Sequence, residues 1–426
     1  MPNSGESSRF RSSRLPGVVG AGALVPLADG SRVEYANLDY AASAPCLTPV
    51  HAALDAALPL YSSVHRGAGY ASKVTTEAYE GARDVVRRFA GISPDESVLF
   101  TRNTTDSMNL LAHCLPEGAT VVVFESEHHA SLLPWDRHCE VVRLPAPASP
   151  EAAVDEVCFA LAAAGIGPKL LVVTAASNVT GELWPLAQLA EAAHEHGARI
   201  VADVAQLVAH RPLDMGALGL DYIAFSGHKL YAPFGAGVLA GRADWLSAAP
   251  PYLLGGGASK RVAGQDVTWA RNAEERQEAG TPNVLGAITL AAACEALLDA
   301  GWPALAAEEE QLLGRLRRGL ASIPGLHELS LWGADHERVG IVSFVLDGWE
   351  SREVALTLSD RYGIGVRDGK FCAHPLLRHL IDDVIRDGPP PEAAVRASLG
   401  LGTTREHVDR LVTALGEIAV PRADAA

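Results

Sequence analysis

Apolar runs of strand length alternate with helical patterns from about residue 37 onward. Seven of these runs predict strands, at residues 98–101, 120–124, 141–144, 170–175, 199–205, 222–226 and 237–240. Their nearly continuous Val, Ile and Leu content is typical of strands that are covered on both faces. Helical patterns such as residues 186–195 separate them, and this alternation is typical of α/β domains. The pattern predicts an α/β fold with a mostly parallel seven-stranded sheet.

The pattern changes after Thr281-Pro282-Asn283. Long helical patterns at 284–298 and 304–321 lead into a smaller mixed unit with strands at 340–346 and 395–401, a helix at 352–362 and a last helix. Thr403 and Glu406 have the spacing of a capping box before that last helix. We therefore expect a loose N-terminal arm over 1–35, a large domain over 36–302 and a smaller C-terminal α/β domain over 303–426 that carries a loop through Cys372.

Composition and charge narrow the class of protein. The 426 residues are 48% hydrophobic and 20% charged, which is typical of a globular protein. The net charge of −16 argues against a nucleic-acid partner. The apolar segment 18–26 is short and interrupted by glycines, and no run approaches the ~20 residues of a membrane span. Six scattered cysteines without a C-x-x-C pair favour neither disulfides nor a zinc site. We expect a cytoplasmic protein with no metal and no membrane partner.

Polar residues stand where the predicted strands end, which is where ligands bind in open α/β sheets. Asp203 ends the strand run RIVAD, Gln206 follows it, and Lys229 comes directly after the next run, YIAF. A lysine there can form a Schiff base with an aldehyde cofactor, and a neighbouring carboxylate can hold a protonated pyridine nitrogen. This pair matches the needs of pyridoxal 5'-phosphate.

Further strand ends supply groups for the rest of such a cofactor. Asn103, Thr104 and Thr105 stand between a strand and a helix, where backbone N–H groups and hydroxyls bind phosphate, and Ser226 and His228 add donors. His128 could stack on the pyridine ring or pass a proton, and Asn178 could reach the cofactor or the substrate. Each residue alone is more often a helix cap, a loop residue or a solvated side chain, but their coincidence at several strand ends favours the site.

The same residues lie in motifs that resemble the class V aminotransferase superfamily of fold-type I pyridoxal phosphate enzymes, and most closely its cysteine desulfurases and selenocysteine lyases. The resemblance covers residues 38–411. Its matching stretches are LDYAASAP, VHRG, TRNTTDSMNL, ESEHHASLLPW, SNVTGEL, HEHGARIVADVAQ, AFSGHKLYAPFGAGVL, EAGTPN and GIGVRDGKFCAHPL.

The resemblance implies a role for each matching residue. Lys229 would form the Schiff base, Asp203 would hold the pyridine nitrogen, Gln206 would lie near the ring hydroxyl and His128 would stack on the ring. The phosphate would be held by Thr104, Thr105, Ser226 and His228, and by Thr281 from the second subunit of a homodimer. The substrate would be bound by Asn178, Arg396, Arg367 and His65.

The implied reaction is the removal of sulfur from L-cysteine. Lys229 would remove the Cα proton, and the Cys372 thiolate would attack the substrate sulfur to leave alanine and a persulfide on Cys372, for delivery to a sulfur-acceptor protein. Thiolate is the reactive form of cysteine, so the cationic side chains of Arg367 and Lys370 would favour the attack.

Departures from the family pattern keep other functions open. Lys370 and Phe371 stand where members carry two histidines before the cysteine, Asp368 replaces a small hydroxyl residue, and Asn103 and Val204 replace glycines. A pyridoxal phosphate C–S lyase or aminotransferase with an incidental Cys372 is the alternative, because related folds host several reactions. A non-catalytic cofactor-binding scaffold is a third possibility, which the presence of Lys229 disfavours.

Overall fold

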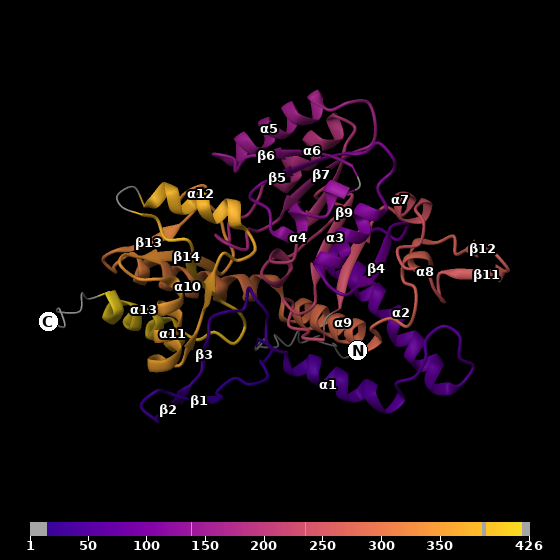
Figure 1. Ribbon diagram of the computed structural model, residues 1–426. Helices are drawn as coiled ribbons and strands as arrows, with labels where there is room; N and C mark the ends of the chain where they lie inside the picture. Colours follow the sequence, from indigo (N-terminus) through magenta and orange to yellow (C-terminus); the bar gives the residue numbers. More distant parts are fainter. Residues whose placement is uncertain (1–14, 138, 235, 386–388, 420–426) are drawn as a thin grey trace, which may run out of the picture.

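The computed structural model describes residues 15–137, 139–234, 236–385 and 389–419 (Figure 1). Its main sheet has seven strands in the order β4-β10-β9-β8-β7-β5-β6, and β10 alone runs antiparallel to its neighbours. The strands are β4 (Ser97–Thr101), β5 (Thr120–Phe124), β6 (Glu140–Leu144), β7 (Lys169–Thr174), β8 (Arg199–Asp203), β9 (Tyr222–Ser226) and β10 (Gly237–Gly241). The predicted α/β fold with a mostly parallel seven-stranded sheet is confirmed.

Both faces of this sheet are buried, as its apolar strands require. In β5, Val122 and Phe124 pack into one core while Val121 and Val123 pack into another, because successive side chains point to opposite faces. The first core includes α2 (Tyr70–Ala90), α5 (Pro150–Ala163), α6 (Leu186–Glu195) and α9 (Val284–Ala300). The second includes α3 (Thr104–His113), α7 (Ala243–Ala248) and α8 (Ala273–Gln277).

A second, four-stranded sheet is antiparallel and lies to the left in Figure 1. Its order is β13-β14-β17-β16, with β13 (Leu326–Leu329), β14 (Ile341–Leu346), β17 (Ala394–Ser398) and β16 (Arg367–Gly369). One face packs on α10 (Trp302–Leu320), α11 (Ser351–Tyr362) and α13 (Arg405–Ala419), and the other on α12 (His374–Val384). The loop between β16 and α12 carries Cys372.

The remaining elements are short or peripheral. They are β1 (Leu24–Pro26), β2 (Arg32–Glu34), β3 (Ala36–Asn37), α1 (Thr48–Ala57), η1 (Leu58–Leu60), α4 (His129–Leu132), η2 (Trp135–Arg137), η3 (Leu207–Ala209), β11 (Ser259–Ala263), β12 (Asp266–Trp269) and β15 (Ile364–Gly365). Strands β11 and β12 form a hairpin that projects at the right of Figure 1.

The N-terminal arm differs from expectation. Residues 1–14 lie outside the described residues, but from residue 15 the arm is tied to the body. The backbone N–H of Thr48 donates to the carbonyl of Gly17, and that of Ala28 donates to the carbonyl of Asp360, both at 2.8 Å. Strands β1 and β2 pair with each other. Backbone hydrogen bonds therefore anchor residues 15–35, which the sequence pattern assigned to a loose arm.

The start of the last helix also needs a small correction. The capping pair is Thr404 and His407, one residue later than the predicted Thr403 and Glu406. The Thr404 hydroxyl accepts from the His407 N–H at 3.2 Å, and the His407 imidazole accepts from the Thr404 N–H at 3.4 Å. Thr403 instead turns its hydroxyl back to the N–H of Gly400.

Within the part of the chain that the structure describes, no single helix has both the length and the apolar composition to cross a membrane. Helices α9 and α10, which meet at an angle of 84°, meet those criteria only as a bent pair.

Candidate functional site

Residues at or after the carboxyl ends of five strands of the main sheet line a cavity. Strands β4, β5, β7, β8 and β9 run in one direction, so their carboxyl ends meet there. The cavity has a volume of about 260 Å³, and residues of β16, of β17 and of the loop after β16 complete its wall. Its polar lining consists of Asn103, Thr104, Thr105, His128, Asn178, Asp203, Ser226, His228, Lys229, Arg367, Cys372 and Arg396.

Lys229 and Asp203 form the buried charged centre of this cavity. Burial lowers the pKa of the Lys229 ammonium, whereas the negative charge of Asp203 opposes that shift. A lowered pKa favours the neutral amine, which is the form that attacks a carbonyl carbon. The Asp203 carboxylate is held from two sides, by the Ser131 hydroxyl at 2.7 Å and by the Ala205 N–H at 3.0 Å. The arrangement presents a fixed carboxylate beside a nucleophilic amine.

The start of α3 supplies hydroxyls and N–H groups on one side of the cavity. Asn103, which replaces a glycine of the family pattern, caps this helix, because its side-chain oxygen accepts from the Asp106 N–H at 3.0 Å. Ser226 accepts from the Thr104 N–H and shares a second hydrogen bond with the Thr104 hydroxyl, both at 2.7 Å. A helix N-terminus with hydroxyls beside it is suited to a phosphate group.

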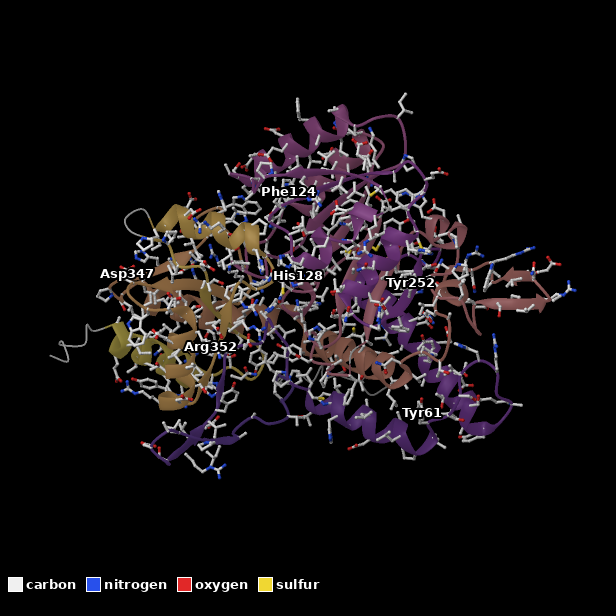
Figure 2. The ribbon with its side chains drawn as sticks, viewed as in Figure 1. Tyr61, Phe124, His128, Tyr252, Asp347 and Arg352 are labelled. Atoms are coloured by element: carbon white, nitrogen blue, oxygen red, sulfur yellow. The ribbon has the colours of Figure 1, made fainter. Side chains whose placement is uncertain are left out.

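His128 lies between the two sheet-bearing parts of the molecule (Figure 2). Its Nδ1 accepts from the Ala130 N–H at 3.0 Å and so caps α4. Burial, together with the charge of Lys229, lowers the pKa of His128 to about 4. The imidazole is therefore neutral at physiological pH.

Arg396 and Asn178 also line the cavity. One Arg396 nitrogen donates to the Asn178 carbonyl at 2.8 Å, and another lies 3.4 Å from Asp39. Burial lowers the pKa of Arg396 to about 10, with Asp39 opposing the shift. The Arg396 Nε is buried and has no hydrogen-bond partner. Since a buried donor without a partner is costly, this group fits an anionic ligand such as an amino acid carboxylate.

Cys372 reaches the cavity from the loop after β16. Its φ of 53° and that of Phe371, 51°, are left-handed, a conformation that residues other than glycine rarely adopt. Asn178 donates to the Phe371 carbonyl at 2.7 Å, and the Phe371 ring lies under the Arg396 guanidinium at 5.0 Å. Cys372 itself is exposed. Strained backbone of this kind is often found at functional sites.

Three predicted site residues do not line this cavity. Gln206 is buried, and its amide donates at 2.9 Å to the carbonyl of Ala41, which does line the cavity. Thr281 and His65 instead line a second cavity of about 1210 Å³, which shares no lining residue with the first. A chain of ion pairs from His65 through Glu80 and Arg83 to Glu278 runs along that second cavity.

Sequence reasoning missed several residues that shape the site. Ser131 and Asp39 lie in motifs already singled out, but no spacing rule links them to Asp203 and Arg396. Glu127 is fully buried, and its carboxylate accepts from the Thr174 N–H at 2.8 Å. Burial and the charge of Asp203 raise the pKa of Glu127 well above its usual range.

These residues fit pyridoxal phosphate. The aldehyde, pyridine nitrogen and phosphate would find an amine at Lys229, a carboxylate at Asp203 and the α3 start, and the unpartnered Arg396 Nε is left for the substrate. Among the described residues, no group of three or more His, Cys, Asp or Glu side chains is placed to hold a metal ion.

Comparisons with known proteins agree with this geometry. The pattern of the family Aminotransferase class-V matches residues 36–411. A cysteine desulfurase from Klebsiella pneumoniae is 37% identical over 371 residues, covering 84% of this chain and 86% of that protein.

Comparison with solved structures also identifies cysteine desulfurases as similar to this chain. The cysteine desulfurase CsdA from Escherichia coli has 32% identity and a TM-score of 0.78, covering 90% of this chain and 94% of that one. The apo cysteine desulfurase from Thermococcus onnurineus has 30% identity and a TM-score of 0.79 with the same coverage. The chain therefore belongs to the class V aminotransferase family of pyridoxal phosphate enzymes, with cysteine desulfurases among its relatives.

Proposed function

We propose that this protein is a pyridoxal phosphate-dependent cysteine desulfurase, which removes sulfur from L-cysteine and leaves alanine and a persulfide on Cys372. The observation that carries the proposal is that Cys372, Lys229 and Arg396, whose Nε has no hydrogen-bond partner, meet at one cavity. A nucleophilic thiol, an amine and a carboxylate receptor are the three groups that this reaction requires of the protein.

Cofactor binding would use the buried centre and the α3 start. Asp203 would hold the pyridine nitrogen, and the phosphate would lie among Thr104, Thr105, Ser226 and His228. When bound, pyridoxal phosphate supplies an electron sink for negative charge at the substrate Cα. The neutral, half-buried His128 would stack on its ring, and Gln206 would lie near the ring hydroxyl.

The other residues act on the amino acid. Arg396, with Asn178 beside it and Arg367 in the same wall, would hold the carboxylate and fix which side of the substrate faces Lys229. Lys229 as a neutral amine can take the Cα proton and return it. The Cys372 thiolate attacks the substrate sulfur, a new S–S bond forms, and the electron pair of the broken Cβ–S bond stays on carbon, which is then protonated to give alanine.

We further propose a homodimer in which Thr281 and His65 of each chain serve the cavity of the other. Their place in a separate cavity supports this proposal, because neither residue lines the cavity of its own chain. The exposure of Cys372 supports delivery of the sulfur to an acceptor protein. The functional division would follow the sheets, with a large cofactor-binding domain over 36–302 and a small domain over 303–426 that carries Cys372.

The deciding experiment measures alanine and sulfide release from L-cysteine, with a reductant present, for the wild type and Cys372→Ser. Cys158→Ser is the matched control, because this partly exposed thiol lies on α5 and does not line the cavity. The visible absorption band of the bound cofactor is recorded for each protein.

We expect Cys372→Ser to lose turnover while it keeps the absorption band, and Cys158→Ser to match the wild type. Full activity of Cys372→Ser would instead favour a C–S lyase or aminotransferase in which Cys372 is incidental. Cysteine conjugates and amino donors would then be the substrates to examine. A purified wild type without the absorption band would favour the non-catalytic scaffold.

A further inference from the structure

Two imidazoles join the Cys372 loop to α4. The rings of His129 and His374 meet edge to face, with their centroids 4.5 Å apart and their planes at 65°. The backbone N–H of His129 donates to the carbonyl of Cys372 at 2.8 Å. His129 begins α4 and His374 begins α12, so this contact links the main sheet to the loop from the four-stranded sheet.

The loop needs such an anchor because its backbone is strained. Phe371 and Cys372 are left-handed in succession, which is unfavourable for residues with a Cβ. Asn178 holds the carbonyl of Phe371, and His129 holds that of Cys372. The hydrogen bond from Asn178 is buried. The hydrogen bond from His129 lies beside two rings that solvent reaches, the half-buried His129 and the exposed His374. The second anchor is thus the one that solvent and pH can reach.

We propose that the His129–His374 contact is a latch that positions Cys372: it holds the thiol at the cavity while both rings are neutral and releases the loop when both are protonated. The proposal rests on the proposed function, in which Cys372 is the nucleophile. His129 and His374 are positioning residues and take no part in bond making.

The charges around the pair support release in acid. His128 faces His129 from the preceding residue, and His374 faces it from α12. Burial, and after it the charge of His374, lower the pKa of His129. Along the loop and α12 the nearby cations are Lys370, paired with Glu392 at 3.1 Å, and Arg378, paired with Asp382 at 2.8 Å. Those carboxylates are engaged elsewhere, so a doubly protonated pair would repel at close range.

Hydrogen exchange at the His129 amide reports directly whether the latch is closed, because this N–H donates the hydrogen bond to the Cys372 carbonyl. The holoenzyme would be compared at about pH 7.5 and about pH 5.5, on either side of the ordinary histidine pKa, with rates corrected for intrinsic exchange. The variants are His374→Phe, which keeps an aromatic ring without a charge, and His374→Ala, which removes the ring. His379→Ala, an exposed histidine on the same helix, is the matched control.

We expect the wild type and His379→Ala to exchange about 10-fold faster at the lower pH, because the latch opens there. His374→Phe should exchange slowly at both pH values, and His374→Ala should exchange rapidly at both. The rate of alanine formation should follow the same order, with His374→Phe keeping its rate in acid.

Slow exchange in His374→Ala at the higher pH, or equal acid sensitivity in His374→Phe, would overturn the latch. The cofactor absorption band shows whether each variant is folded and loaded. Cys372→Ser separates the two proposals, because it should keep the wild-type exchange pattern whether or not Cys372 is the nucleophile. An unchanged turnover in Cys372→Ser would thus refute the desulfurase without touching the latch.

Discussion

Ser131→Ala tests the charged centre of the site through a residue that touches neither substrate nor cofactor in our proposal. The Ser131 hydroxyl is fully buried and donates to Asp203 at 2.7 Å. Alanine removes this donor and leaves Asp203 with the Ala205 N–H on its other oxygen. The substitution creates almost no cavity, so its effect should come from the lost hydrogen bond.

The magnitude follows from the charge and burial of the acceptor. A hydrogen bond to a charged group contributes about 1.5–3 kcal/mol, and about 1.4 kcal/mol corresponds to a tenfold change in rate. Because Asp203 retains one donor, we expect kcat/KM for L-cysteine to fall roughly 10- to 100-fold. Cofactor affinity should weaken as well, since the carboxylate that would hold the pyridine nitrogen is less firmly held.

The assay is steady-state alanine release together with cofactor titration followed by absorption. Ser126→Ala is the control, because Ser126 is also buried, lies five residues earlier and has a hydroxyl without a partner. Ser126→Ala should keep wild-type kinetics. If Ser131→Ala and Ser126→Ala behave alike, the hydrogen bond to Asp203 does not contribute to catalysis and the reasoning is refuted.

Three further predictions concern other parts of the molecule. Arg396→Lys should raise KM for L-cysteine about 10-fold or more while kcat changes less, because a single ammonium cannot replace the guanidinium contacts to Asn178 and Asp39. Steady-state kinetics test this, and an unchanged KM would contradict it. The free energy of unfolding of the cofactor-free protein should fall as pH drops from 6.5 towards about 4, because the folded state lowers the pKa of His128 and favours the neutral ring. Urea unfolding should show a weaker pH dependence in His128→Asn, and the same pH dependence in the variant and the wild type would count against this cause. Glu182→Ala should lower the free energy of unfolding in urea by about 3–5 kcal/mol, because this fully buried carboxylate accepts from Ser330 and from two backbone N–H groups and pairs with Arg338. A decrease below about 1 kcal/mol would disprove its role in stability.

The strands and their polar ends could be predicted because both signals are local. A buried parallel strand is a continuous apolar run in the sequence, and polar residues mark its carboxyl end. Asp203 and Lys229 could therefore be identified from the residues next to them in the sequence. The helix predicted at 186–195 is α6 as the structure has it. The family resemblance and the α/β fold are confirmed by the comparisons.

Contacts between distant segments could not be predicted in this way. Ser131 and Asp203 are 72 residues apart, and Asp39 and Arg396 are 357 apart, so no periodicity joins them. The prediction of the capping pair was wrong for a different reason. Thr403 and Thr404 are adjacent and both fit a cap, and the turn at Gly400 takes the first of them. The roles of the individual site residues, Thr281 and His65 included, stay predictions until the variants are measured.

The link between Asn178 and Arg396 has a consequence for biosynthesis. A ribosome makes Asp39, Asn178 and Lys229 well before it makes Cys372 and Arg396, which contribute the final wall of the cavity. Domains generally fold as units during synthesis, so the seven-stranded sheet can form while this wall is still missing. During that interval its catalytic edge is open to solvent and to chaperones. A chain truncated before residue 396 should fold its main sheet and still lack the buried guanidinium that we propose for the substrate carboxylate.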